Sequence, residues 1–462
     1  MSPTAVPTDK SNGATKAQPK LQYLHGFGNH FESEAVPGTL PALGNNPQRA
    51  AHGLYTECLS GTAFTAPRHR NQRSWLYRLR PSANHKPYAP YATPNPRLVS
   101  SFHAFSPDID ATPQQLRWNP LEVAGADGHD FVDSLTTLGG AGDPQLKNGL
   151  AIHFYNFARD MVNKAFYSSD GDMLIVPVHG DLLLTTEFGK LHVPPLHIAV
   201  VQRGLKFSVS YVNRDAPSAR GYILETFKGH FELPELGPIG SNGLANAKDF
   251  ESPVAWYEDK ADQGTYTVVN KFVGKLYQYE QDHSPYDVVA WSGNYVPYRY
   301  DLEKFNVIGT VTYDHPDPSI YTVLTCPSDT PGTAVADFVI FAPRWLVAEK
   351  TFRPPWYHRN VMSEFMGLIC GSYDAKAEGF LPAGASLHNM CTAHGPDAET
   401  FNKASAADLA PHKVGEGSMA FMFESAYQIL TTKWAIQDSG KVQKDYWKAW
   451  QGCDRVSDLP QQ

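Results

Sequence analysis

The clearest pattern along the chain is a series of short apolar stretches separated by Gly, Pro and polar residues. Between Gly171 and Val212, these stretches are of strand length and recur about every 8–12 residues, which is typical of antiparallel strands joined by turns. The spacing predicts a β-sandwich or a β-barrel in this half of the chain. The expected strands lie within Asp172–Gly180, Asp181–Gly189, Lys190–Val193, His197–Val201 and Leu205–Val212.

A second series of strand-like stretches starts near Phe305, so we expect a mainly β fold with two β-sandwich or jelly-roll lobes and a few short helices. The expected division is a disordered tail at 1–20, an N-terminal β-rich domain at 21–300 and a C-terminal domain at 301–462. The strands of the second series are expected at Asn306–Tyr313, Ile320–Leu324, Phe338–Phe341 and Met419–Phe423.

Four segments are candidates for helix. Asn148–Asn163 has apolar residues at helical spacing, although its aromatic content also allows a strand. The other three candidates are Trp118–Asp130, Ala255–Asp262 and Lys441–Gly452.

Composition narrows the class of protein. The 462 residues are 42% hydrophobic and 19% charged, with a net charge of −8, so the chain has ample core material and no basic surplus for nucleic acid. No apolar stretch approaches the roughly 18 residues that cross a membrane. The five cysteines are scattered and form no C-x-x-C pair, which indicates reduced thiols and a cytoplasmic location.

One group of residues suggests a metal site. His358 and Glu364 are six positions apart, and His394 follows thirty residues later. Two imidazoles and one carboxylate form the facial triad of non-haem Fe(II) oxygenases, which leaves open positions for substrate and dioxygen. An even offset places both side chains on one face of a strand, unless a turn separates them. His388 competes with His394 as a ligand, and spacing alone does not choose between them.

Other residues are candidates for acid–base chemistry or substrate binding. His315 lies in a Pro-rich loop between Asp314 and Asp317, whose carboxylates would raise the proton affinity of its imidazole. His283 is a similar loop histidine, and Tyr373 could hold a substrate hydroxyl. From these residues alone, a zinc hydrolase using the same ligands and a non-catalytic β-sandwich binding module are alternatives to an oxygenase.

Several long stretches closely resemble the homogentisate 1,2-dioxygenase family of tyrosine and phenylalanine catabolism. The resemblance runs from about Tyr23 to Trp447 and favours the oxygenase over both alternatives. The stretches that carry it are Tyr23–Ala35, Gln281–Trp291, Tyr313–Ile320, Asp337–Trp345, Phe352–Leu368 and Ala393–Ala398.

This resemblance implies specific roles and a specific reaction. It implies one Fe(II) bound by His358, Glu364 and His394, an acid–base role for His315, and substrate contacts from Tyr373 and His394. The implied reaction opens the ring of homogentisate with O2 and gives maleylacetoacetate. The implied architecture is a C-terminal jelly-roll of the cupin kind, assembled as a homo-hexamer from two trimers.

Overall fold

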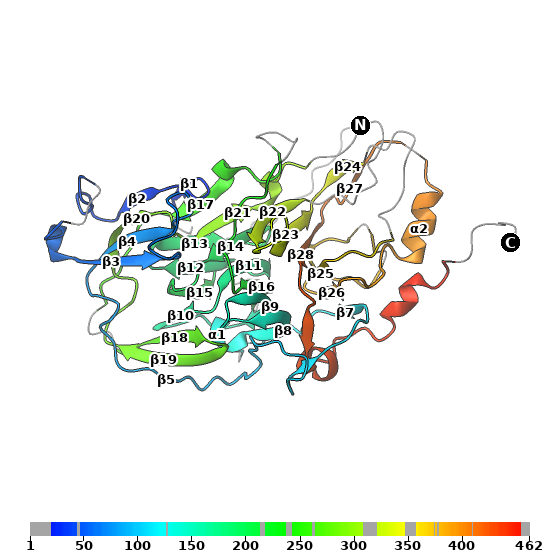
Figure 1. Cartoon of the computed structure of the whole chain (residues 1–462), viewed down its shortest axis with the longest axis horizontal. Coiled ribbons are helices and arrows are strands. Elements are labelled where there is room, and N and C mark those ends of the chain that lie inside the picture. The colour runs from blue at the N-terminus through cyan, green and yellow to red at the C-terminus, as the bar shows by residue number, and fades with distance from the viewer. Residues whose placement is uncertain are drawn as a thin grey trace, which may run out of the picture.

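The computed structural model describes residues 20–43, 47–125, 128–212, 218–236, 243–260, 264–307, 321–346, 357–373, 375–376, 378–408 and 410–453. Within these ranges the chain is mainly β with a few short helices, as expected (Figure 1). Nearly all strand pairs are antiparallel, and the strands form three larger sheets and two smaller ones.

A ten-stranded sheet forms the centre of the molecule. Its middle strands are apolar on both faces, as expected for a sheet covered on both sides. In spatial order the strands are β1 (Tyr23–His25), β17 (Phe250–Pro253), β21 (Tyr298–Asp301), β14 (His197–Val201), β11 (Asp172–His179), β16 (Ala219–Thr226), β9 (Asn148–Phe157), β8 (Thr136–Asp143), β29 (Leu430–Thr432) and β6 (Ile109–Asp110).

A seven-stranded sheet packs on one face of the central sheet, and an apolar cluster fills the space between them. Residues of β12 and β15 alternate between buried and half-buried positions, which is the pattern of a sheet with one covered face. In order the strands are β13 (Gly189–Val193), β12 (Leu182–Thr186), β15 (Phe207–Tyr211), β10 (Lys164–Ser168), β18 (Tyr266–Phe272), β19 (Lys275–Gln281) and β5 (Ala89–Pro90).

A six-stranded antiparallel sheet contains most strands of the C-terminal half. Its strands are β22 (Thr322–Pro327), β23 (Ala334–Phe341), β28 (Met419–Ser425), β25 (Ser363–Cys370), β26 (Ala385–His388) and β7 (Leu116–Trp118). The two halves of the chain exchange strands, because β7 pairs with β26 in this sheet while β29 pairs with β8 in the central sheet. Each half therefore contributes a strand to the main sheet of the other.

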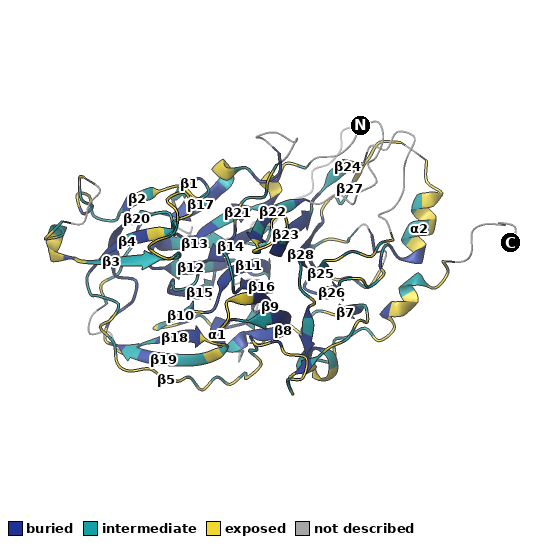
Figure 2. Ribbon diagram, in the orientation of Figure 1, coloured by how far each residue is buried: buried dark blue, intermediate teal, exposed yellow. Residues whose placement is uncertain are grey.

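The six-stranded sheet has two different faces. Phe365 and Phe423 point toward the central sheet and join a large apolar cluster that contains Tyr222 and Leu224 from β16. Met366 and Met422, one position along each strand, point to the opposite face and belong to a small separate cluster. Figure 2 shows that the inner strands are buried, whereas much of α2 (Ala398–Ser405) is exposed.

The remaining elements are short. A four-stranded sheet contains, in order, β2 (Phe31–Glu34), β20 (Val288–Gly293), β4 (Arg73–Arg78) and β3 (Tyr55–Ser60). A two-stranded sheet contains β24 (Arg344–Leu346) and β27 (His412–Val414). Besides α2, the helical segments among the described residues are α1 (Phe131–Ser134), the 3-10 turns at Ala51–Gly53, Ala247–Asp249, Leu302–Lys304 and Tyr446–Trp450, and a π-turn at Trp434–Asp438.

Of the four helix candidates, two contain no helix in the described residues, one is a strand and one is a short 3-10 turn. Asn148–Phe157 is a strand, because its aromatic and branched residues pack on both faces of the central sheet. Residues 119–125 and 255–260 contain no helix. The expected C-terminal amphipathic helix is only the 3-10 turn at Tyr446–Trp450.

The described residues agree with the expected reduced thiols, since all five cysteines are free. A search of the described helices found none with the length and apolar character that a transmembrane segment requires. The expected tail at 1–20 lies, apart from Lys20, outside the described residues.

Candidate metal centre

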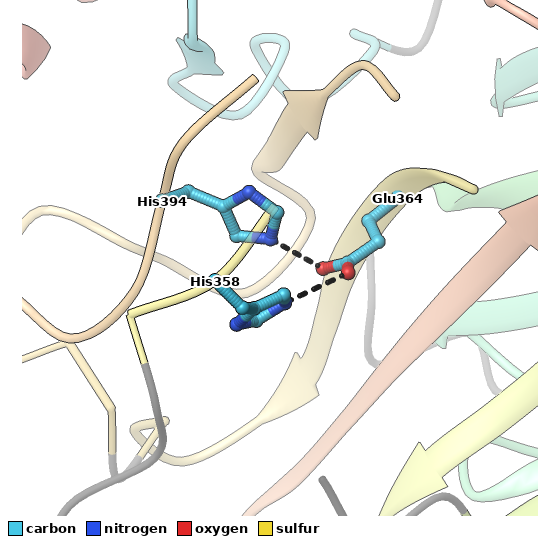
Figure 3. Close-up of side chains that lie close together, drawn as sticks. All are labelled: His358, Glu364 and His394. Atoms are coloured by element: carbon cyan, nitrogen blue, oxygen red, sulfur yellow. Dashed lines mark hydrogen bonds and ion pairs between the residues drawn. The ribbon is translucent and has the colours of Figure 1, made fainter. Parts of the chain in front are cut away.

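Three side chains converge at the start of β25, an interior strand of the six-stranded sheet, and they are the three that the sequence singled out. Nε2 of His358 lies 3.2 Å from Oε1 of Glu364, and Nε2 of His394 lies 3.0 Å from Oε2 of the same carboxylate (Figure 3). One donor atom from each residue lies within 4.8 Å of the other two, so the group could hold a metal ion. Two imidazoles and a carboxylate suit Fe(II), with coordination positions left open.

The three residues reach this point by different routes. Glu364 is the second residue of β25, whereas His358 and His394 lie in loops that pair with each other through two backbone hydrogen bonds of 2.9 and 3.1 Å. A bend at residues 361–362 separates His358 from β25. The expectation that a shared strand aligns His358 and Glu364 is therefore wrong, and the alternative, a turn between them, is what the structure has.

The hydrogen bonding of His394 fits a metal ligand. Its Nδ1 lies 2.8 Å from the carbonyl oxygen of Thr392, which can only accept, so Nδ1 of the neutral ring carries the hydrogen. Nε2 then directs a lone pair toward the carboxylate of Glu364. Two lone pairs that face each other at 3.0 Å need a cation, either a proton or a metal ion. Such an outer contact on the second ring nitrogen is the usual way to orient a metal-bound histidine.

Glu364 is held as a carboxylate although it is buried. Burial by itself would raise its pKa, but the contacts of its carboxylate with the imidazoles of His358 and His394 hold the pKa well below the usual range. Asn360 also donates to Oε1 at 3.0 Å and fixes the orientation of the carboxylate. The site thus presents one negative charge to a cation at neutral pH.

A row of polar residues crosses the sheet at the level of Glu364. Glu364 is the register partner of His388 on β26 and of Glu424 on β28, and Glu424 is in turn paired with Asp337 on β23. Directly paired residues of antiparallel strands share a face, so these side chains follow the metal-site side of the sheet. Burial, with the charges of Glu364 and Asp337, raises the pKa of Glu424 to about 7.

The apolar surface beside this row carries the expected substrate tyrosine. Met366 and Met422 lie two residues along their strands from Glu364 and Glu424, on the same face. Tyr373 packs against this cluster, and its ring centroid lies 5.3 Å from that of Phe341. The residues that could receive an aromatic ring therefore lie next to those that could hold the metal.

The other histidine candidates have different positions. His315 lies outside the described residues. His283 is buried between β19 and β20 of the N-terminal half, with Nδ1 2.8 Å from Asp282, and it does not join the His–Glu–His group. His388 lies against the group without belonging to it, because its ring stacks on that of His394 at 4.5 Å while its Nε2 contacts Tyr446.

Sequence reasoning missed three residues near the centre. Glu424 interrupts an otherwise apolar strand, and this interruption was a usable signal. Tyr446 lies within Lys441–Gly452, which the sequence suggests only as a helix, and no sequence pattern indicates a role for Lys376. No local pattern relates Lys376 or Tyr446 to His388, because the three are joined only by tertiary contacts.

Comparisons with known proteins give a consistent assignment. The sequence model described as homogentisate 1,2-dioxygenase N-terminal matches residues 22–302, and the corresponding C-terminal model matches residues 303–457. Homogentisate 1,2-dioxygenase of Mus musculus is 54% identical over 436 residues, which cover 94% of this chain and 96% of the mouse protein.

Solved structures give weaker similarities. Oxalate decarboxylase from Bacillus subtilis is 11% identical, with 75% of this chain and 88% of that chain covered at a TM-score of 0.27. Protein Ylba from E. coli is 7% identical, with 70% and 96% covered at the same TM-score of 0.27. These scores are too low to establish a shared overall fold. By the two sequence models and the mouse relative, the chain belongs to the homogentisate 1,2-dioxygenase family.

Proposed function

We propose that this protein binds one Fe(II) through His358, Glu364 and His394 and there opens the ring of homogentisate with O2 to give maleylacetoacetate. The dioxygenase activity follows from family membership. The assignment of the three ligands rests on one observation, the convergence of two imidazole nitrogens on one buried carboxylate.

The ligand set explains how the site could take its substrates. One carboxylate and two neutral imidazoles leave a ferrous site with a net positive charge, which favours an anionic aromatic acid. When bound, the iron would supply the electronic path between the ring and O2. The protein residues supply the geometry and handle protons.

Tyr373 and His315 are assigned to substrate contacts by resemblance. In this proposal the Tyr373 hydroxyl holds the substrate, while its ring packs against the apolar cluster beside β25. His315 accepts the proton of the ring hydroxyl ortho to the acetate arm, which leaves that oxygen as an anionic phenolate. Met366 and Met422 offer thioether groups to the ring, and such contacts with aromatic faces are favourable.

The division of the chain and its assembly belong to the same proposal. We assign the chemistry to the C-terminal domain at 301–462 and a scaffold role to residues 21–300. We also propose the homo-hexamer of two trimers and the cytoplasmic location that the sequence suggests. Size-exclusion chromatography with light scattering would test the assembly, and a mass of two or three chains would contradict it.

Anaerobic reconstitution tests the function. Metal-free protein is loaded with Fe(II) without oxygen, homogentisate and air are added, and oxygen uptake is followed together with absorbance of the ring-opened product. We expect one O2 consumed per substrate and no turnover without oxygen. Turnover that continues without oxygen would indicate a hydrolase and contradict the proposal.

Variants test the residues. His358→Ala, Glu364→Ala and His394→Ala should lose iron and turnover together, whereas His412→Ala, at an exposed position of the same half, should retain both. His315→Ala should retain iron and lose about 10²–10⁴-fold in turnover. A triad variant with full iron content and full activity would refute the ligand assignment.

A further inference from the structure

Lys376 differs from the other buried cations of the described residues. Four Lys or Arg side chains are buried there, and three of them face carboxylates: Arg78, Lys206 and Lys271. Nζ of Lys376 instead contacts two uncharged oxygens, the carbonyl of Gly395 at 3.1 Å and the hydroxyl of Tyr446 at 3.0 Å. A buried ammonium without a carboxylate is costly to the fold, so its retention calls for a reason.

Both contacts of Lys376 lead to His394. Gly395 directly follows His394 in the chain, so the first contact anchors the loop that carries this histidine. The second contact leads through Tyr446 to His388, whose Nε2 lies 2.9 Å from the tyrosine hydroxyl. The His388 ring in turn lies flat against the His394 ring, with an interplanar angle of 8°.

The direction of the first hydrogen bond in this path is fixed, because a lysine ammonium can only donate and the Tyr446 oxygen therefore accepts from Lys376. The same hydroxyl also bonds Nε2 of His388, as donor or acceptor according to the tautomer of the imidazole. With either tautomer the His388 ring cannot rotate without losing this bond. Its fixed ring limits the orientations open to His394 on the other side of the stack.

We propose that Lys376 is a positioning residue that holds His394 in its ligand orientation through Gly395 and through Tyr446 and His388. This inference rests on the proposed function, because it takes His394 as a metal ligand. In this proposal the orientation of His394 depends on two other segments: the one that carries Tyr373 and Lys376, and the C-terminal turn at Tyr446–Trp450. Outer contacts of this kind typically change metal affinity by about 10–100-fold.

Cobalt titration of the metal-free full-length protein tests this role without relying on turnover. Co(II) is added in competition with a chelator, and its visible absorption reports both affinity and ligand geometry. Lys376→Met removes the charge and the donors but keeps an unbranched side chain that ends one atom short of Nζ. We expect its Co(II) dissociation constant to rise about 10–100-fold and its cobalt spectrum to shift.

Tyr446→Phe isolates the path through His388, because it removes only the hydroxyl. We expect its affinity for Co(II) to be several-fold weaker. In a variant with both Lys376→Met and Tyr446→Phe, the dissociation constant should rise by less than the product of the two single increases, because both substitutions act on one path. Lys448→Met is the matched control: it removes a half-exposed lysine from the same turn and should bind Co(II) like the wild type.

The outcomes separate this inference from the proposed function. If Glu364→Ala binds Co(II) normally, the metal-site assignment itself fails. If Glu364→Ala loses Co(II) while Lys376→Met and Tyr446→Phe keep wild-type affinity and spectrum, only the positioning role is refuted. A raised KM for homogentisate with unchanged Co(II) affinity also refutes it. If Lys376→Met does not fold, Tyr446→Phe decides alone, and wild-type affinity there overturns the proposal.

Discussion

Gly367 lies where the metal-site sheet meets the central sheet, three residues after Glu364 on β25. A Cβ at this position would lie 2.3 Å from Cζ and 2.5 Å from Cε1 of Phe421, and 3.0 Å from Cζ of Tyr222. These rings pack edge to face with centroids 4.9 Å apart and are fully buried. Gly367→Ala therefore tests how closely the six-stranded sheet packs against the central sheet, through its effect on the stability of the protein.

The expected cost follows from these distances. Carbon atoms pack at about 3.5–4.0 Å, so the Phe421 ring would have to move by about 1.2 Å or more. It cannot move freely, because the rings of Phe338 and Phe423 lie 5.8 and 4.9 Å away. Overpacking of this kind costs about 1–3 kcal/mol, and we expect the upper end. The reduced entropy of the unfolded chain offsets about 0.5–1 kcal/mol, which leaves a net loss of roughly 2 kcal/mol.

Thermal and urea denaturation of the metal-free protein measure this loss. We expect Tm to fall by roughly 4–8 °C, on the basis of about 2–4 °C per kcal/mol for a large cooperative unit. Gly125→Ala is the matched control, since a Cβ there meets no atom within 4 Å. The cost should shrink in a Phe421→Leu background, which lacks the clashing ring atoms. Wild-type stability of Gly367→Ala would refute the argument that the two sheets are locked together at this point.

Two further predictions concern other parts of the molecule. Nδ1 of His230 lies 2.6 Å from the fully buried carboxylate of Asp172; burial opposes the charged imidazole, but the charge of Asp172 raises the pKa of His230 overall. Stabilisation by a raised pKa is present below the unfolded value of about 6.5 and is lost as the pH rises through the folded value. His230→Asn should therefore cost about 1.5–3 kcal/mol in urea denaturation at pH 5.5 and clearly less at pH 9, and an equal loss at both would contradict the ion pair. Tyr373→Phe should keep bound iron and stability, because the ring still packs, and should lower kcat/KM for homogentisate roughly 2–10-fold through loss of one hydrogen bond. Unchanged steady-state kinetics would remove the hydroxyl from the substrate contacts.

Much of the strand content could be predicted because alternation and turn residues are local properties. The expected strands from Asp172 to Val212 correspond closely to β11–β15. The interpretation of Asn148–Asn163 shows the limit of this approach. Helical spacing and a strand buried on both faces give similar apolar patterns over ten residues, and only the neighbouring strands β8 and β16 decide between them.

The candidate site divides in the same way. The residue types of the triad and their family resemblance could be read from the sequence, but spacing alone left His388 and His394 as competitors. The structure separates them by their partners, since Nε2 of His394 faces Glu364 while Nε2 of His388 faces Tyr446.

The sequence by itself determined that the protein is mainly β, where the strands between Asp172 and Val212 lie, and which histidines and glutamate are chemically suited to iron. Only the tertiary structure decided that β7 and β29 cross between the halves, that Glu424 lies beside Glu364, and that Lys376 reaches the region behind His394. The physical reason is that a strand's periodicity depends on its own residues. Its register and its neighbours depend instead on packing many distant segments around a common core at once.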